Sequence, residues 1–160
     1  LFLAGMVGER ALVRNSGARA VLEGVGDHAL EYMTGGVAVI LGSTGRNVGA
    51  GMSGGTAYVL DLDHNMVNQS ALSTGELMLE QLDAADRELL TELLTAHVEE
   101  TGSRFVQSLL DDSAETFARI TKLLPRDFAA VTAIRQRAEV EGIDPDGDIV
   151  WQQIMEVTGG

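Results

Sequence analysis

The sequence predicts a β-solenoid, a right-handed parallel β-helix of about three coils of 19 residues, followed by an α-helical tail. Three observations carry this prediction. Glycines recur every 19 residues in the first sixty positions, a short β-type run follows each of them, and helical periodicity replaces both after Asp61. Self-similarity at a fixed spacing is typical of stacked repeats. We therefore expect a glycine-repeat β-helix at 1–61 and an acidic helical region at 62–160 that packs on or beside the solenoid.

The repeat is visible in short motifs that recur along the sequence. Met-Thr-Gly-Gly at 33–36 returns as Met-Ser-Gly-Gly at 52–55. Glycine suits a turn with positive φ, or a position where a Cβ atom would strike the neighbouring coil. We expect the repeat glycines to be structural, and they fall into two phases: Gly17, Gly36 and Gly55 in one, Gly26 and Gly45 in the other.

The predicted strands are the runs at 18–23, 37–41 and 56–60, which are rich in Val, Leu, Ile or Tyr. A unit this short cannot bury its own apolar face. Stacking in register, with strands about 4.8 Å apart, aligns the apolar side chains into interior ladders. The repeat also explains a G-x-G-x-x-G match at Gly49, Gly51 and Gly54. A dinucleotide loop of that type opens a helix, whereas a β-type run follows here, so we interpret the match as a structural turn.

Charge divides the chain where glycine does. Residues 1–60 hold four acids and four arginines, so the remaining hundred residues carry the whole net charge of −13. This charge argues against a nucleic-acid partner, and no apolar run approaches the roughly 18 residues of a membrane span. The chain has no cysteine, which excludes disulfides, thiolate ligands and a cysteine nucleophile on it. We expect a cytoplasmic protein and, because Leu1 opens inside an apolar run, a fragment or processed product.

In the second region the periodicity predicts amphipathic helices. We expect the first to begin at the N-cap Asp83 and end at Gly102, and the second to begin at Ser103. A third is expected from Ser113 to Pro125, a fourth over 126–141 and a short last one over 150–157. The side chains expected to be buried are Leu89, Leu90, Leu93, Leu94, His97 and Val98 in the first helix, Phe105, Val106, Leu109 and Leu110 in the second, and Phe117, Ile120, Leu123 and Leu124 in the third.

Several short segments of the sequence closely resemble one protein family. They lie at 8–17, 23–28, 31–36, 45–47 and 51–59, and they are similar to the C-terminal glycine-repeat (GXGXG) β-helix of glutamate synthase large (alpha) subunits. The resemblance is dense over 5–61. A looser match through 97–103 and 117–128 looks like the helical tail that follows this β-helix.

The resemblance implies a place in a larger oxidoreductase that serves ammonia assimilation. In that family an amidotransferase domain uses a cysteine to release ammonia from glutamine. A synthase domain with FMN and an iron–sulfur cluster then reduces the imine formed with 2-oxoglutarate to glutamate. The β-helix braces these two domains and is expected to carry no chemistry and no cofactor. The implied partners are the remaining domains of the large subunit and a small reductase subunit.

Four groups of side chains are candidates for chemical sites. His28, beside Asp27 and Glu31, forms an acid–base pair or a brace within a turn. Asp61, Asp63 and His64 form a metal site or are ordinary acids at a strand exit. Asp144, Asp146 and Asp148 alternate as in a calcium loop, but Gly147 is misplaced for one. His97, on an apolar helix face, is interpreted as a packed residue. We expect no catalytic, cofactor-binding or metal-binding residue on this segment.

Two other functions stay open at this point. The chain could be a stand-alone, non-catalytic glycine-repeat assembly subunit of a related multi-subunit oxidoreductase. An independent hydrolase or metal-binding enzyme would have only the weak clusters above to support it, and a stoichiometric, tightly held metal ion would favour that function.

Overall fold

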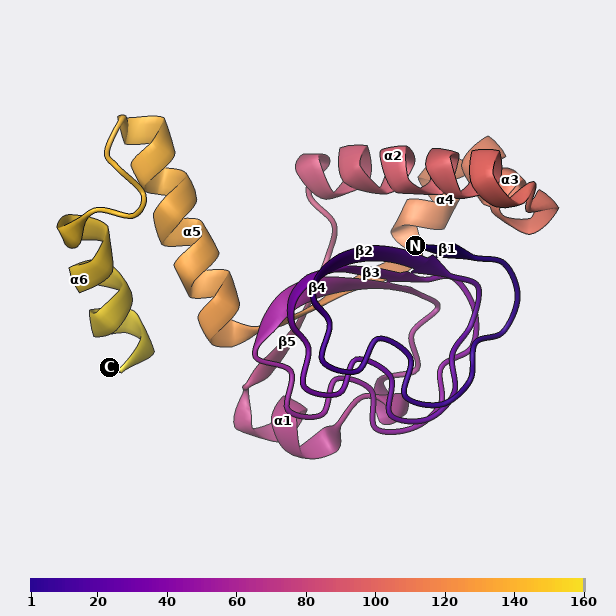
Figure 1. Cartoon of the computed structure of the whole chain (residues 1–160), viewed down its shortest axis with the longest axis horizontal. Helices are drawn as coiled ribbons and strands as arrows, with labels where there is room; N and C mark the ends of the chain where they lie inside the picture. The colour runs from indigo at the N-terminus through magenta and orange to yellow at the C-terminus, as the bar shows by residue number, and fades with distance from the viewer. Residues whose placement is uncertain (160) are drawn as a thin grey trace.

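The computed structural model describes residues 1–159 and shows a β-solenoid of about three coils with six α-helices (Figure 1). Each coil contributes one strand to a six-stranded sheet, in the order β1-β2-β3-β4-β6-β5. The strands are β1 Phe2–Leu3, β2 Ser16–Leu22, β3 Thr34–Ile40, β4 Gly54–Leu60, β5 Leu77–Glu80 and β6 Ile120–Pro125. The helices are η1 His64–Met66, α1 Gln69–Thr74, α2 Ala84–Thr101, α3 Arg104–Asp111, α4 Ser113–Ala118, α5 Arg126–Glu141 and α6 Asp148–Thr158.

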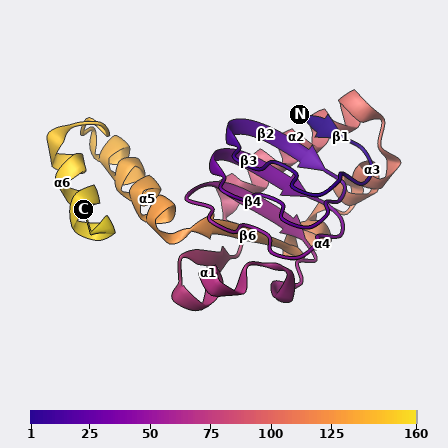
Figure 2. The ribbon, with the colours of Figure 1, turned by 60° about the horizontal axis from the view of Figure 1, so that its bottom comes forward.

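Strands β1 to β4 are parallel and stack one above the other, as Figure 2 shows. Equivalent residues lie in register along the stack. Ala20 pairs with Ala38, eighteen residues on, and Ala38 pairs with Ala57, nineteen residues on. A bulge shifts the register near the start of both the β2–β3 and the β3–β4 pairing. The spacing between paired residues therefore changes by one residue within each pairing, and both shifts lie inside the strands, near their first residues.

Alternating side chains of each strand fill two separate cores. One ladder, Leu22, Ile40 and Val59, points into the solenoid, while its neighbour, Val21, Val39 and Tyr58, points to the opposite face. The second face is covered by α2, α3 and α4 (Figure 1). A sheet buried on both faces explains why its strands read as nearly continuous apolar runs. The side chains of α2, α3 and α4 that complete this core are Leu90, Leu93, Leu94, Val106, Leu109 and Phe117.

The interior of the solenoid is closed after the third coil. Residue Val67 forms a parallel bridge with Val48, nineteen residues earlier, as the start of a fourth coil would. The chain then turns into α1, whose N-cap is Asn68, and Ala71 of α1 joins the interior core. Helix α1 and strand β5 therefore shield apolar side chains that a further coil would otherwise cover.

The third predicted helix was wrong in its second half. Helix α4 ends at Ala118, and Ile120, Leu123 and Leu124 belong to strand β6. This strand runs antiparallel to β4 on one side and to β5 on the other. The exposed edge of β4 supplies backbone partners that a helix over 120–124 would leave unpaired, and this tertiary pairing outweighs the local helical pattern. Two strands from the region 62–160 thus complete the sheet begun by 1–61.

The other helical predictions are confirmed in outline. Asp83 caps α2 and forms a capping box with Asp86, Gly102 ends the helix with φ of 66°, and Ser103 caps α3. Helix α5 spans Arg126–Glu141 and α6 contains the predicted 150–157. Phe105 was predicted to be buried but is 44% exposed, because α3 turns Val106 and Leu109 towards the sheet instead.

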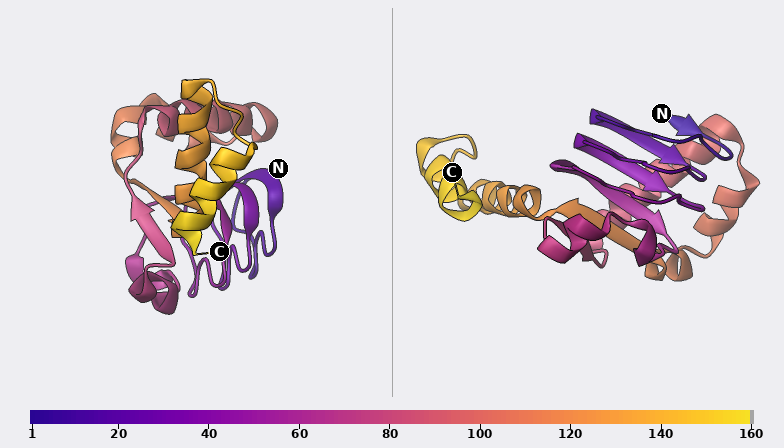
Figure 3. Two further views of the ribbon diagram at one scale, coloured as in Figure 1. Left: turned by 90° about the vertical axis from the view of Figure 1, so that its left-hand side faces the viewer. Right: turned by 90° about the horizontal axis from the view of Figure 1, so that it is seen from below.

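Helices α5 and α6 with the loop 142–147 form what we call the C-terminal hairpin. It projects from the body of the molecule, beyond the end of β6, as the right-hand view of Figure 3 shows. A small core of its own holds the two helices together: Val131, Ile134, Ala138, Val150 and Ile154. Among the described residues, no helix is long and apolar enough to cross a membrane.

Candidate functional site: polar joints between coils and helices

Four of the five repeat glycines, Gly26, Gly36, Gly45 and Gly55, lie where an added Cβ atom would come within 3.0 Å of the preceding coil. Gly36 has φ of 88°, and a Cβ atom there would lie 2.4 Å from the carbonyl oxygen of Ala18. At Gly45 it would lie 2.3 Å from the amide nitrogen of Asp27. Gly17 differs, since a Cβ atom added to it would meet nothing within 4 Å among the described residues. The same phase of the repeat therefore contains both a tightly constrained and an open position.

Asp27 joins the second coil to the third. Its Oδ1 accepts a 2.7 Å hydrogen bond from the backbone amide of Arg46, and its Oδ2 accepts one of 3.0 Å from the Arg46 guanidinium. The backbone bond, followed by the side-chain bond, holds the pKa of Asp27 below its usual value. Through these bonds Asp27 holds two coils in register.

His28 lies in a line of polar side chains that crosses the coils. Its Nδ1 is 3.3 Å from Oε1 of Glu31 and 3.2 Å from Nδ2 of Asn47. The Oδ1 of Asn47 accepts a hydrogen bond from Asn68, whose own Oδ1 caps α1 by accepting from the Ala71 amide. His28 and Asn47 both have positive φ, at 63° and 65°. These contacts are those of a brace that connects two coils with the helix closing the solenoid.

Glu23, in the turn after β2, connects the solenoid with α2 and α3. Its Oε1 accepts hydrogen bonds from Ser103 and from Nε2 of His97, the latter at 3.1 Å, while Oε2 accepts from the Gly5 amide at 2.8 Å. Burial opposes ionisation of Glu23. The bonds from Ser103, Gly5 and His97 outweigh that effect, so the pKa of Glu23 lies below its usual value. One carboxylate thus ties together the first coil, the second-coil turn and two helices.

We call this set of contacts around Glu23 a joint, because it connects the solenoid with α2 and α3. His97 is fully buried within it. The phenyl ring of Phe2 in β1 packs edge-on against it, with ring centroids 5.9 Å apart. Its Nε2 bonds Glu23, whereas its Nδ1 is buried without a hydrogen-bond partner among the described residues. The tautomer with the proton on Nε2 fits this setting, because a carboxylate can only accept. His97 therefore combines apolar packing with one directional bond to the solenoid.

Asp86 forms a second joint, between the start of α2 and the sheet. It accepts a 2.7 Å hydrogen bond from the Tyr58 hydroxyl of β4, and Nζ of Lys122 in β6 lies 3.0 Å away. Burial opposes ionisation of Asp86, but bonds from Tyr58, the Asp83 amide and Lys122 lower its pKa below the usual value. Burial, and then the bond to Asp86, raises the pKa of Tyr58. The Tyr58 hydroxyl therefore remains a donor at neutral pH.

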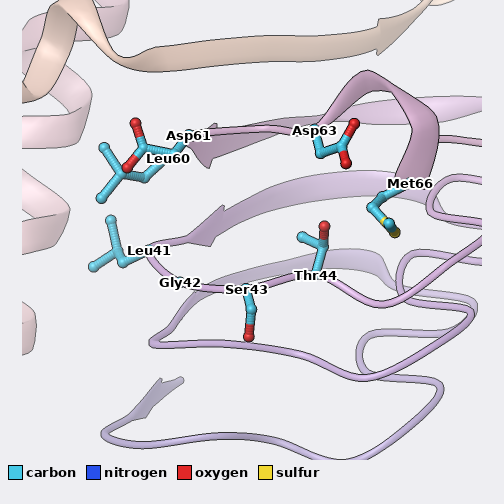
Figure 4. Close-up of a pocket in the computed structure, with 8 residues that line it drawn as sticks. All are labelled: Leu41, Gly42, Ser43, Thr44, Leu60, Asp61, Asp63 and Met66. Atoms are coloured by element: carbon cyan, nitrogen blue, oxygen red, sulfur yellow. The ribbon is translucent and has the colours of Figure 1, made fainter.

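The candidate metal ligands at the exit of β4 are brought only partly together. Asp61 is paired with Arg119, whose Nε lies 3.0 Å from Oδ1, and this bond lowers the pKa of Asp61. The Oδ1 of Asp63 caps η1 by accepting from the Asn65 amide. Both carboxylates line a surface cleft of about 360 Å³ (Figure 4), whereas His64 is not among the lining residues. The residues of the cleft are Leu41, Gly42, Ser43, Thr44, Leu60, Asp61, Asp63 and Met66.

The acids of the loop 142–147 are also used locally. The Oδ1 of Asp144 accepts from the Asp146 amide, Asp146 pairs with Arg135 at 3.0 Å, and Asp148 begins α6. Within residues 1–159, no group of three or more histidine or acidic side chains is placed to hold a metal ion. The G-x-G-x-x-G segment leads into β4, and a Cβ atom added to its Gly51 would lie 2.6 Å from ring carbons of Tyr32.

The joints at Glu23 and Asp86 could not be assembled from the sequence. Ser103 lies 80 residues from Glu23, and Lys122 lies 36 residues from Asp86. Weak signals exist all the same. Tyr58 alternates with Ala57 and Val59, which places its hydroxyl on the outer face of the sheet. Lys122 is a lone charge inside an apolar run, a pattern that indicates a buried partner.

One family of known proteins matches the part of the chain that forms both joints. The profile of the GXGXG motif family matches residues 1–126, which span the whole solenoid and the helices covering its sheet. That match ends at the first residue of α5. The C-terminal hairpin therefore lies almost wholly outside the part matched by the family.

The similar curated proteins are glutamate synthases. The chain is 47% identical over 131 residues to the glutamate synthase [NADH] of Schizosaccharomyces pombe, covering 81% of this chain and 6% of that protein. It is 50% identical over 133 residues to the ferredoxin-dependent glutamate synthase of Pyropia yezoensis, covering 82% and 8%. It is 34% identical over 151 residues to the glutamate synthase [NADPH] large chain of Bacillus subtilis, covering 94% and 10%.

The chain thus spans a tenth or less of the length of these three relatives. The family match and the sequence identity to these relatives confirm the resemblance found in the glycine-containing segments. Both cover the coils and the joints. On these grounds the chain belongs to the GXGXG motif family, as a domain of the glutamate synthase type.

Proposed function

We propose that this chain is the structural GXGXG domain of a glutamate synthase large subunit. In this proposal it braces an amidotransferase domain and a synthase domain while glutamate is formed from glutamine and 2-oxoglutarate, and it contributes no catalytic group. The observation that carries the proposal is the similarity to glutamate synthases over both solenoid and joints.

The contacts of the reactive side chains support a bracing role. His28, His97 and Asp86 are the groups with the best chemistry for catalysis, and each is engaged in linking coils or helices. The sheet is covered on both faces by two cores, so the coils and α2 to α4 are packed into one continuous body. A unit of this kind can hold two domains at a fixed separation because packed interiors deform little.

The cofactors of the proposed enzyme are FMN and an iron–sulfur cluster, held by other parts of the large subunit. The sequence fits this division, since iron–sulfur clusters are bound chiefly by cysteine thiolates and the chain has no cysteine. The relatives named above include NADH-, NADPH- and ferredoxin-dependent enzymes. We infer that the choice of electron donor, and with it any small reductase subunit, is determined outside this segment. A cytoplasmic location accords with this role.

The test is the size and activity of the native protein that carries this segment. An antibody against residues 1–159 should detect, in extract of the source cells, a band far larger than 17.0 kDa. That band should co-purify with flavin and with glutamine-dependent glutamate formation. A native band near 17 kDa without this activity would contradict the proposal and would favour a separate assembly subunit.

A further inference from the structure

A single junction joins the C-terminal hairpin to the body of the molecule. Strand β6 ends at Pro125 and α5 begins at Arg126 with no loop between them, and no side chain caps the first turn of α5. The Arg126 amide donates a 2.9 Å hydrogen bond to the carbonyl oxygen of Glu76. Within the described part of the chain, no hydrogen bond or ion pair connects residues 127–159 with residues 1–125. The end of an element that is held in this way can absorb a rotation and act as a hinge.

Helix α5 has two faces, and only one of them packs within the hairpin. Val131, Ile134 and Ala138 lie in the small core shared with α6. The opposite face, at helical spacing, carries no charge, whereas the other positions of α5 hold six charged residues. An uncharged stripe on a charged helix is typical of a packing face. We call it the uncharged face of α5, and it consists of Phe128, Ala129, Thr132, Ala133 and Gln136.

The uncharged face of α5 lines a cleft of about 370 Å³ that separates it from the body. The facing wall is formed by the outer side of the sheet, with Thr56 and Lys122, and by the start of α2, with Ala85. Figure 1 shows that α2 begins on the side of the body from which α5 departs. Ala85 faces a helix that presents Ala129 and Ala133, and side chains this small allow two helices to approach closely. The walls of the cleft are therefore shaped to come together.

The polar groups of the two walls are also complementary. The body contributes the carboxylates of Glu80 and Asp83, which can only accept hydrogen bonds, while α5 contributes the hydroxyl of Thr132 and the amide of Gln136, which can donate them. Lys122, the one cation lining the cleft, is engaged by Asp86. Among the described residues, no hydrogen bond spans the cleft from Thr132 or Gln136 to these carboxylates. Donors and acceptors thus face each other without being joined.

We propose that the C-terminal hairpin swings about the junction of Pro125 and Arg126 and closes the uncharged face of α5 onto the start of α2. Closure expels water from the cleft and lets Thr132 and Gln136 donate to the carboxylates of the body. Parts of one chain that share only a small interface move relative to each other. The hairpin moves as a unit because it has a core of its own. The hinge is a property of this chain alone and is independent of the proposed function.

Distances between pairs of spin labels on the full chain test the hinge. The chain has no cysteine, so labels attach only where one is introduced. Glu88→Cys on α2 and Glu139→Cys on α5 are exposed positions outside the cleft, and pulsed electron paramagnetic resonance should give two distance maxima for this pair. The shorter maximum belongs to the closed hairpin. Glu88→Cys with Gln107→Cys, within the body, and Glu139→Cys with Glu156→Cys, within the hairpin, should each give one maximum.

Two substitutions on the uncharged face should reduce closure. Ala133→Phe fills the cleft and should lower the ratio of the shorter to the longer distance by about tenfold. Val140→Phe is the matched control, because it adds a ring to the same helix at a position that is 90% exposed, and it should change the ratio by less than about twofold. Gln136→Glu sets a carboxylate against Glu80 and Asp83 and should lower the ratio by about threefold, less so at high salt.

A single maximum for the pair at 88 and 139, no wider than those of the two control pairs, would overturn the proposal. A ratio left unchanged by Ala133→Phe, or changed as much by Val140→Phe, would do the same, since the motion would then not close this cleft. A second maximum for the pair within the hairpin would show that α5 and α6 separate instead. Circular dichroism checks that Ala133→Phe remains folded, and Gln136→Glu, at an exposed position, keeps the test decisive if it does not.

Discussion

The body of the molecule, residues 1–125, and the C-terminal hairpin use their apolar side chains in opposite ways. In the body, strands β2, β3 and β4 bury side chains on both faces, and polar groups such as Glu23 and Asp86 are paired across elements. In the hairpin a core of five residues leaves Trp151 and Met155 in solvent. The contrast shows that stacked coils form a rigid body with few exposed apolar side chains. The appended pair of helices has a small core and leaves apolar side chains exposed.

The largest effect is expected at a repeat glycine of the body. Gly36→Val forces a β-branched residue into positive φ and places Cβ 2.4 Å from a backbone oxygen. We expect it to lower the free energy of unfolding by more than about 4 kcal/mol, or to prevent folding. Thermal denaturation followed by circular dichroism measures this.

Gly17→Val is the matched control for Gly36→Val. It occupies the same phase of the repeat, but a Cβ atom there meets nothing within 4 Å among the described residues. Its effect should stay within about 1 kcal/mol. Equal melting temperatures for the two variants would show that contact between stacked coils does not determine which glycines are required.

The second largest effect is expected when a core residue of the body is compared with a surface residue of the hairpin. Leu94 of α2 is fully buried against the sheet, so Leu94→Ala should cost about 2–5 kcal/mol, from lost apolar burial and the cavity that remains. Met155→Ala in the hairpin should change stability by no more than about 0.5 kcal/mol, because its side chain is half exposed. Urea denaturation of both variants provides the comparison, and a larger loss at Met155 would reverse the division of roles drawn here.

The third effect is a dependence on pH that originates in the joints. The pKa values of Glu23 and Asp86 are lowered in the folded state from ordinary values of 4.5 and 3.8. Each carboxylate therefore contributes stability above its unfolded pKa, and that contribution is lost as pH falls through the folded pKa. We expect the urea midpoint to fall below pH 4.5, and the variant Glu23→Gln/Asp86→Asn to show a weaker dependence. An unchanged acid dependence in that variant would place its origin elsewhere.

The smallest effect is expected at His28. Its side chain is 41% exposed, and its contacts to Glu31 and Asn47 lie at the surface of the stack. His28→Ala should cost about 1 kcal/mol or less. A loss comparable to that of Gly36→Val, measured by the same thermal denaturation, would mean that the polar line and not the glycine contacts holds the coils together.

The same contrast explains how far the sequence predicts this molecule. The β-solenoid and the caps at Asp83, Gly102 and Ser103 follow from repeats and local signals, because coil stacking and helix capping depend on nearby residues. Strand β6 does not follow, since its partner β4 lies about sixty residues earlier and its apolar run fits a helix equally well. The joints at Glu23 and Asp86 need the same long-range information. The exposure of Trp151 needs it too, because apolar periodicity does not say whether anything covers the face.

The most direct test of the proposed bracing role is the coupling of the two half-reactions in the proposed full-length glutamate synthase. Glu23→Ala removes the carboxylate that joins the first coil, α2 and α3, and leaves His97 buried without its partner. Glutamine hydrolysis and the reduction of 2-oxoglutarate with added ammonium should each stay within twofold of the unchanged enzyme. Glutamate formed per glutamine hydrolysed should fall from two towards one, because hydrolysis itself releases one glutamate while the ammonia escapes between domains that are no longer held in place. Full coupling with both half-reactions intact would contradict the bracing role. Loss of one half-reaction would instead show that this segment takes part in the chemistry itself.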